Sequence, residues 1–167
     1  MRPIQMVDLK QQYEHIKPEV DAAIHSVLDS CAFINGKPVQ DFAEHLSAYS
    51  GSKHVIPCAN GTDALQIALM ALGLQLGDEV ITPSFTYIAT TEVIALLRLK
   101  PVFVEVDTKT FCISLEAIEK AITSKTRAIV PVHLYGQSAN MEAIMQIAEK
   151  HNLYVIEDNA QAIGCDY

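Results

Sequence analysis

Two short polar runs contain the residues of this sequence that are best suited to chemistry. The first is Cys58-Ala-Asn-Gly-Thr-Asp-Ala-Leu-Gln66, which opens an amphipathic helical pattern. The free N–H groups and the positive dipole end of a helix start bind phosphate, and here Gly61 allows close approach while the Thr62 hydroxyl adds a donor. Ordinary capping, with Asn60 as N-cap and Asp63 as its partner three residues later, explains the same residues without a ligand.

The second run is Leu153-Tyr-Val-Ile-Glu-Asp-Asn-Ala-Gln161, an apolar strand pattern that delivers a carboxylate at its end. Open parallel sheets bind ligands beyond the carboxyl ends of their strands, which is where Asp158 falls. A carboxylate in that place can keep the ring nitrogen of pyridoxal phosphate protonated, so that the ring withdraws electrons from a substrate. Glu157 alternates to the other face, and Gln161 can reach the phenolic oxygen of the ring or be solvated. A helix-capping or salt-bridged acid is the alternative for Asp158.

Two further segments follow predicted strands at the same sheet edge. Thr82-Pro-Ser-Phe-Thr-Tyr87 places an aromatic side chain there, and Tyr87 or Phe85 could stack on a flat ring or belong to the core. His133-Leu-Tyr-Gly-Gln137 closes the fourth strand in a loop. His133 and Tyr135 are therefore candidates for a substrate pocket, with a hydrogen-bonded structural histidine as the alternative for His133.

The elements that position these residues follow from the hydrophobic pattern. Apolar runs recur at intervals of 23 to 26 residues, and helical patterns fill the gaps. This alternation predicts an α/β fold in three layers, a mostly parallel sheet with helices on both faces. The expected strands are His54–Pro57, Glu79–Thr82, Val102–Val106, Arg127–Pro131 and Leu153–Glu157.

The helices are indicated by their ends as well as by their apolar faces. Ser114 is the expected N-cap of a helix over residues 115–122, and Asn152 lies where a helix over residues 141–148 and its last turn should end. Residues 1–50 predict a helical arm of two helices, about Ile16–Ser30 and Pro38–Ser50, packed on the same domain as residues 51–167.

Composition narrows the class of protein. The 167 residues fit one domain, and 12 basic against 20 acidic side chains give a net charge of −8, which opposes binding to nucleic acid or anionic membranes. The N-terminus lacks the pattern of a signal peptide, so we expect a cytoplasmic protein. Four cysteines without a Cys-x-x-Cys pair predict buried, reduced thiols, and the spacing of the six histidines predicts no metal site.

In order, these segments resemble the DegT/DnrJ/StrS sugar aminotransferases, fold type I enzymes that use pyridoxal 5′-phosphate. The resemblance covers nearly the whole chain. The matching runs are Val7-Asp-Leu9, Phe33-Ile-Asn-Gly36, Cys58-Ala-Asn-Gly-Thr-Asp-Ala-Leu65, Gly77-Asp-Glu-Val-Ile-Thr-Pro83 with Thr86-Tyr87, Pro131-Val-His-Leu-Tyr-Gly-Gln137 and Val155-Ile-Glu-Asp-Asn-Ala-Gln161.

The resemblance implies a role for individual residues. Gly61 and Thr62 would bind the phosphate, Tyr87 would stack on the ring, Asp158 would pair with the ring nitrogen, and Gln161 would contact the phenolic oxygen. It further implies a homodimer that transfers an amino group from glutamate to a keto sugar linked to a nucleotide. The amino-terminal residues Asp8 and Asn35 would lie near the substrate pocket.

One departure from the family pattern concerns the Schiff-base lysine. The family carries this lysine beyond the acid-to-glutamine motif in a Ser-rich loop, whereas all nine lysines of this chain precede Asp158. We therefore expect these residues to be the amino-terminal part of a longer enzyme, without the lysine segment and the C-terminal small domain, and to be inactive alone. The alternatives are a non-catalytic regulatory or dimerising half-domain, and part of a sugar dehydratase in which histidine replaces the lysine.

Overall fold

The computed structural model describes residue 4 and residues 6–165. The chain divides into two compact units, residues 1–57 and residues 58–167, and each is described by itself. The N-terminal unit contains two helices, α1 (Leu9–Ser30) and α2 (Lys37–Ser50), as the sequence predicts. Helix α1 begins earlier than expected because the Asp8 carboxylate caps it, accepting a hydrogen bond of 2.9 Å from the Gln11 N–H.

The turn between α1 and α2 requires its Asn-Gly pair. Asn35 has a left-handed backbone with φ of 49°, a conformation that asparagine tolerates. A Cβ atom on Gly36 would lie 2.5 Å from the Ala32 carbonyl oxygen, so no larger residue fits. The predicted turn is therefore confirmed.

The second unit is built on a four-stranded parallel sheet. Its strands are β1 (Glu79–Pro83), β2 (Lys100–Val104), β3 (Thr126–Ile129) and β4 (Tyr154–Val155), in the order β2-β1-β3-β4. Its helices are α3 (Gly61–Ala71), α4 (Ala89–Leu96), α5 (Leu115–Ala121) and α6 (Met141–His151), with a short 3-10 turn η1 at Leu134–Gly136. Ser114 caps α5 and Asn152 ends α6, as expected.

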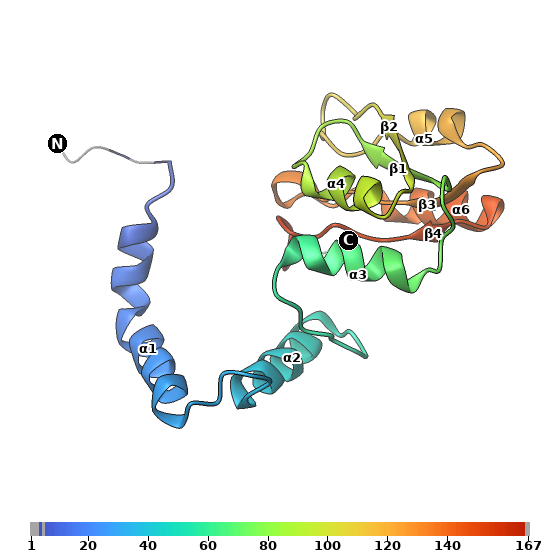
Figure 1. The fold of residues 1–167 in the computed structure, drawn as a ribbon. Coiled ribbons are helices and arrows are strands. Elements are labelled where there is room, and N and C mark those ends of the chain that lie inside the picture. Colours follow the sequence, from blue (N-terminus) through green and yellow to red (C-terminus); the bar gives the residue numbers. More distant parts are fainter. Residues whose placement is uncertain (1–3, 5, 166–167) are drawn as a thin grey trace. The chain divides into compact units, whose positions relative to one another are not determined.

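Helices cover both faces of this sheet (Figure 1). On one face Val80 of β1 packs with Leu69 of α3 and with Val93 of α4. On the other face Ile81 packs with Ile118 of α5 and Ile144 of α6. Consecutive residues of β1 thus enter opposite cores, as the alternation of side chains along a strand requires. The expected three-layer α/β architecture is confirmed.

Two expectations about this fold were wrong. Residues 54–57 form no strand, because a strand exists only where its backbone pairs with a neighbour and no described segment pairs with this one. The four cysteines, all within the described residues, form no disulfide, as expected, yet only Cys112 is buried, whereas Cys31, Cys58 and Cys165 are exposed. Flanking small and apolar residues therefore do not ensure burial.

Among the helices that the structure describes, none combines the length and the apolar character needed to cross a membrane.

Candidate functional site

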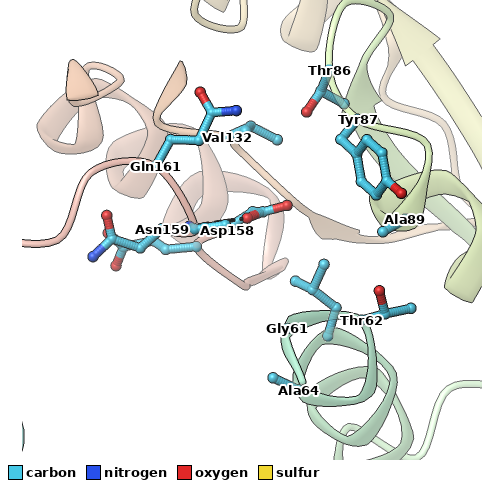
Figure 2. Close-up of a pocket in the computed structure, with 13 residues that line it drawn as sticks. Gly61, Thr62, Ala64, Thr86, Tyr87, Ala89, Val132, Asp158, Asn159 and Gln161 are labelled. Carbon is cyan, nitrogen blue, oxygen red and sulfur yellow. Dashed lines mark hydrogen bonds between the residues drawn. The ribbon is translucent and has the colours of Figure 1, made fainter. Parts of the chain in front are cut away.

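A cavity of about 330 Å³ lies at the carboxyl ends of the strands in the second unit. Its volume falls at the lower end of the ~300–1,000 Å³ typical of small-molecule sites. Figure 2 shows Asp158 and Gln161 on one side of the hollow and Thr62 and Tyr87 on the other. The lining residues are Gly61, Thr62, Ala64, Leu65, Thr86, Tyr87, Ala89, Val132, Glu157, Asp158, Asn159, Ala160 and Gln161. The structure thus brings together all five predicted cofactor-binding residues.

The start of helix α3 forms one wall of the cavity. Asn60 caps the helix by accepting a hydrogen bond of 2.9 Å from the Asp63 N–H, and its amide donates to the Asp63 carboxylate at 3.1 Å. These two hydrogen bonds hold the Asp63 side chain against Asn60. Within the described part of the chain, the N–H groups of Gly61 and Thr62 have no hydrogen-bond acceptor. The capping interpretation is therefore correct, and it leaves two donors at the cavity.

Packing within this chain does not require glycine at position 61. A Cβ atom built on it would meet no atom within 4 Å, and its backbone is not in the left-handed region. Gly61 also lines the cavity. Glycine at this position therefore keeps the helix start accessible to a ligand.

Asp158 forms the facing wall and is held at four points. Its backbone N–H donates to the Pro131 carbonyl at 2.9 Å, and its carbonyl accepts from the His133 N–H at 3.1 Å. One carboxylate oxygen accepts from the Thr90 hydroxyl at 2.8 Å and the other from the Ala160 N–H at 3.3 Å. Only 9% of the residue is exposed, so this acid is both fixed and largely shielded from water.

Thr90 is a site residue that the sequence did not reveal. It lies in the first turn of α4 with 1% of its surface exposed, and its bonding partner is 68 positions away along the chain. The local sequence does not single it out, because the polar residues Thr91 and Glu92 follow it in the same helix. Burial of Thr90 requires a hydrogen-bond partner, but the sequence near it does not show the acceptor.

Gln161 contributes an amide whose orientation is set by its neighbour. Its side-chain oxygen accepts a hydrogen bond of 2.8 Å from the Tyr135 backbone N–H. Because a backbone N–H can only donate, the oxygen must face Tyr135, and the NH₂ group is left to donate elsewhere. This arrangement is compatible with the predicted contact to a phenolic oxygen.

Aromatic side chains from three loops meet near the same edge. Phe111 lies between Phe85 and Tyr135, with ring centroids 5.8 Å and 6.2 Å away. Tyr135 is 69% exposed and does not line the cavity. Tyr87, 73% exposed, does line it, and its ring is free to cover a ligand.

His133 is bonded through both ring nitrogens. Its Nδ1 accepts from the Ala139 N–H at 3.1 Å, so its Nε2 carries the proton and donates to the Glu157 carboxylate at 2.9 Å. It is 4% exposed and borders a second cavity of about 260 Å³ with Ser138 and Cys165. Its place in a substrate pocket stays a prediction, and its hydrogen bonds are those of a structural histidine.

Asp8 and Asn35 belong to the N-terminal unit. Asp8 caps α1, and Asn35 forms the turn before α2. Their part in substrate binding also stays a prediction.

A charged cluster marks the opposite end of β1. Glu79 is 5% exposed, and the hydroxyl of Thr123 and then the ammonium of Lys100 hold the pKa of its carboxylate below the usual value of 4.5. Because Glu79 begins the strand whose other end faces the cavity, this cluster stabilises the sheet and lies away from the site.

Comparison with known proteins places this geometry in a family. The family sequence model for the DegT/DnrJ/EryC1/StrS aminotransferase family matches residues 14–167 of this chain. The chain belongs to this family. It is 52% identical over 164 residues to the pleiotropic regulatory protein of Geobacillus stearothermophilus, covering 98% of this chain and 44% of the relative.

Other members of the family show the same relation. The chain is 50% identical over 164 residues to UDP-2-acetamido-2-deoxy-3-oxo-D-glucuronate aminotransferase of Pseudomonas aeruginosa, covering 98% of this chain and 46% of the relative. The crystal structure of S. venezuelae DesV in complex with a ketimine intermediate matches with a TM-score of 0.94 and 42% identity, over 98% of this chain and 44% of that chain. The chain thus spans less than half the length of these family members.

Proposed function

We propose that this chain forms the cofactor-binding part of a pyridoxal-phosphate-dependent aminotransferase that moves an amino group from glutamate to a nucleotide-linked keto sugar. The observation that carries the proposal is the meeting of Gly61, Thr62 and Asp158 around one cavity, although they lie about a hundred positions apart in the sequence. The family membership and the aminotransferase relatives support the reaction type.

The residues present fit the cofactor. A phosphate group needs N–H donors that are not already used, and the N–H groups of Gly61 and Thr62 meet this need at a helix start. A protonated ring nitrogen needs a fixed carboxylate, and Asp158 supplies one on the facing wall. Gly61 leaves space that a larger side chain would fill.

Each residue has a defined task in this proposal. Gly61 and Thr62 bind the phosphate, and Tyr87 covers one face of the ring. Asp158 accepts a hydrogen bond from the ring N–H and keeps that proton in place, while the Gln161 amide donates to the phenolic oxygen. When bound, the cofactor supplies an electron sink for the carbon that gains or loses the amino group.

Part of the cavity wall is apolar. Val132, Ala89 and Leu65 line it with apolar surface, which strengthens the interaction between Asp158 and a ring N–H because the local dielectric is low. The protein therefore orients the ring and fixes its protonation state.

The decisive experiment uses the complete gene product that contains these residues. With glutamate and UDP- or dTDP-linked keto sugars, we expect 2-oxoglutarate and an amino sugar in equal amounts, measured by a coupled assay and by mass spectrometry. Asp158→Asn should lower kcat by about 100-fold, since it removes the charge that holds the ring proton. The absence of any amino sugar from all keto sugars offered would refute the proposal.

The same experiment separates the alternatives. A deoxy keto sugar formed with loss of water would identify a dehydratase. Failure to bind pyridoxal phosphate or any nucleotide sugar would identify a non-catalytic regulatory or dimerising protein. A homodimer in the cytoplasm is part of the proposal, and sedimentation of the purified protein and fractionation of cells test it.

A further inference from the structure

Thr90 is joined to the acid of the cavity by a buried hydrogen bond. Its hydroxyl donates to one carboxylate oxygen of Asp158 at 2.8 Å, and the two residues are 1% and 9% exposed. Thr90 belongs to α4, whereas Asp158 lies beside the extension of β3. The bond therefore ties the acid to a separate element of the fold.

Two hydrogen bonds fix the orientation of the carboxylate. Asp158 accepts one bond at each oxygen, from Thr90 and from the Ala160 N–H. The group cannot rotate without breaking at least one of these bonds. Of the two, Thr90 makes the shorter bond, and it comes from outside the loop that carries the acid.

Packing alone does not account for a hydroxyl at position 90. Neighbouring residues of the same helix, Ala89, Val93 and Ile94, are apolar and buried, and valine has the shape of threonine without a polar group. The hydroxyl of Thr90 bonds the Asp158 carboxylate, which belongs to a different element of the fold.

We propose that Thr90 is a positioning residue whose hydroxyl holds the Asp158 carboxylate in the orientation that faces the ring nitrogen of the cofactor. This inference rests on the proposed function, since it requires that Asp158 faces that nitrogen. Thr90 itself does not line the cavity and acts through the acid.

The test compares two ligands that differ only at the ring nitrogen. Pyridoxamine 5′-phosphate binds without a covalent bond to lysine, and its 1-deaza analogue carries C–H in place of the nitrogen. The complete gene product is titrated with both by calorimetry, as wild type, Thr90→Val, Thr90→Ser and, as a matched control on the next residue of the helix, Thr91→Val. Thermal unfolding of each variant checks the fold.

The preference for pyridoxamine phosphate over its deaza analogue is the quantity that decides. We expect Thr90→Val to lower this preference by about tenfold, the factor that corresponds to a lost hydrogen bond to a charged group. Thr90→Ser and Thr91→Val should keep the wild-type preference. If the role of Thr90 were only structural, Thr90→Val would weaken the binding of both ligands equally.

The outcomes separate the two proposals. A wild-type preference that Thr90→Val leaves intact overturns the role of Thr90 and leaves the cofactor site standing. A wild-type protein that binds neither ligand, or binds both alike, overturns the proposed contact of Asp158 with the ring nitrogen and the inference with it.

Discussion

Replacing Gly61 by alanine separates cofactor binding from stability. In this chain the added Cβ atom would meet nothing within 4 Å, and the backbone of Gly61 suits any residue. The smaller entropy of the unfolded chain should therefore raise the free energy of unfolding by about 0.5 kcal/mol. Thermal unfolding of the apo protein should show an unchanged or slightly higher Tm.

The same methyl group should damage binding. It would be added to a residue that lines the cavity of about 330 Å³, at the helix start where the phosphate is expected. Moving the phosphate away from an N–H donor costs about 1.5–3 kcal/mol, the value of a hydrogen bond to a charged group. The Kd for pyridoxamine phosphate should accordingly rise by roughly 10- to 100-fold in a calorimetric titration.

Gly73→Ala is the matched control. Gly73 also has open space around it, but its φ of 65° is strained for alanine, so this variant should lose about 1 kcal/mol of stability with an unchanged Kd. If Gly61→Ala destabilised the fold and kept the Kd, glycine would serve the backbone and the phosphate assignment would be wrong.

Three further changes test the site and the sheet. Tyr87→Ala should raise the Kd for pyridoxamine phosphate about fivefold, because ~1 kcal/mol of contact with the ring is lost. The Tm should stay constant because Tyr87 is 73% exposed. An unchanged Kd would show that Tyr87 does not contact the cofactor. Thr82→Val should raise the Tm by about 2–4 °C in a thermal melt. The reason is that the Thr82 hydroxyl is fully buried without a hydrogen-bond partner among the described residues. A lower Tm would show that the hydroxyl has a hydrogen-bond partner. Thr123 and Lys100 lower the pKa of Glu79, so this residue stabilises the fold above its unfolded pKa of 4.5 and loses that contribution as the pH falls through its folded pKa. Glu79→Gln should therefore flatten the decline in the free energy of unfolding below pH 4.5, measured by urea titrations. An unaltered slope would contradict this linkage.

The sequence predicted those parts of the molecule that depend on local pattern. The start of α3 is set by neighbouring residues through capping, whereas β4 ends at Val155, two residues before the predicted end at Glu157. Parallel strands then bring their carboxyl ends to one edge, so the meeting of Tyr87, after β1, with Asp158 in one cavity follows from the fold class. The position of Thr62 does not follow in this way, because residues 54–57 form no strand.

Features that depend on distant partners were not predictable in this way. The bond from Thr90 to Asp158 joins residues 68 positions apart, and nothing near either residue specifies the other. Residues 54–57 have the composition of a strand, yet pairing decides whether a strand forms. His133 left two interpretations open because only the folded chain shows that both ring nitrogens are occupied.

The pleat of the strand decides which of two adjacent acids faces the cavity wall opposite Thr62. Ile156 packs in the core beside α3 and α4, and Val155 in the core beside α5 and α6. Asp158 therefore shares a face with Ile156. The Glu157 side chain alternates to the other face, where it bonds His133, although both residues line the cavity. Slippage by one residue would exchange the two acids and separate Glu157 from its histidine. The backbone bonds of Asp158 to the segment around Val132 fix the register that prevents this exchange, so the position of the acid rests on the sheet as well as on Thr90.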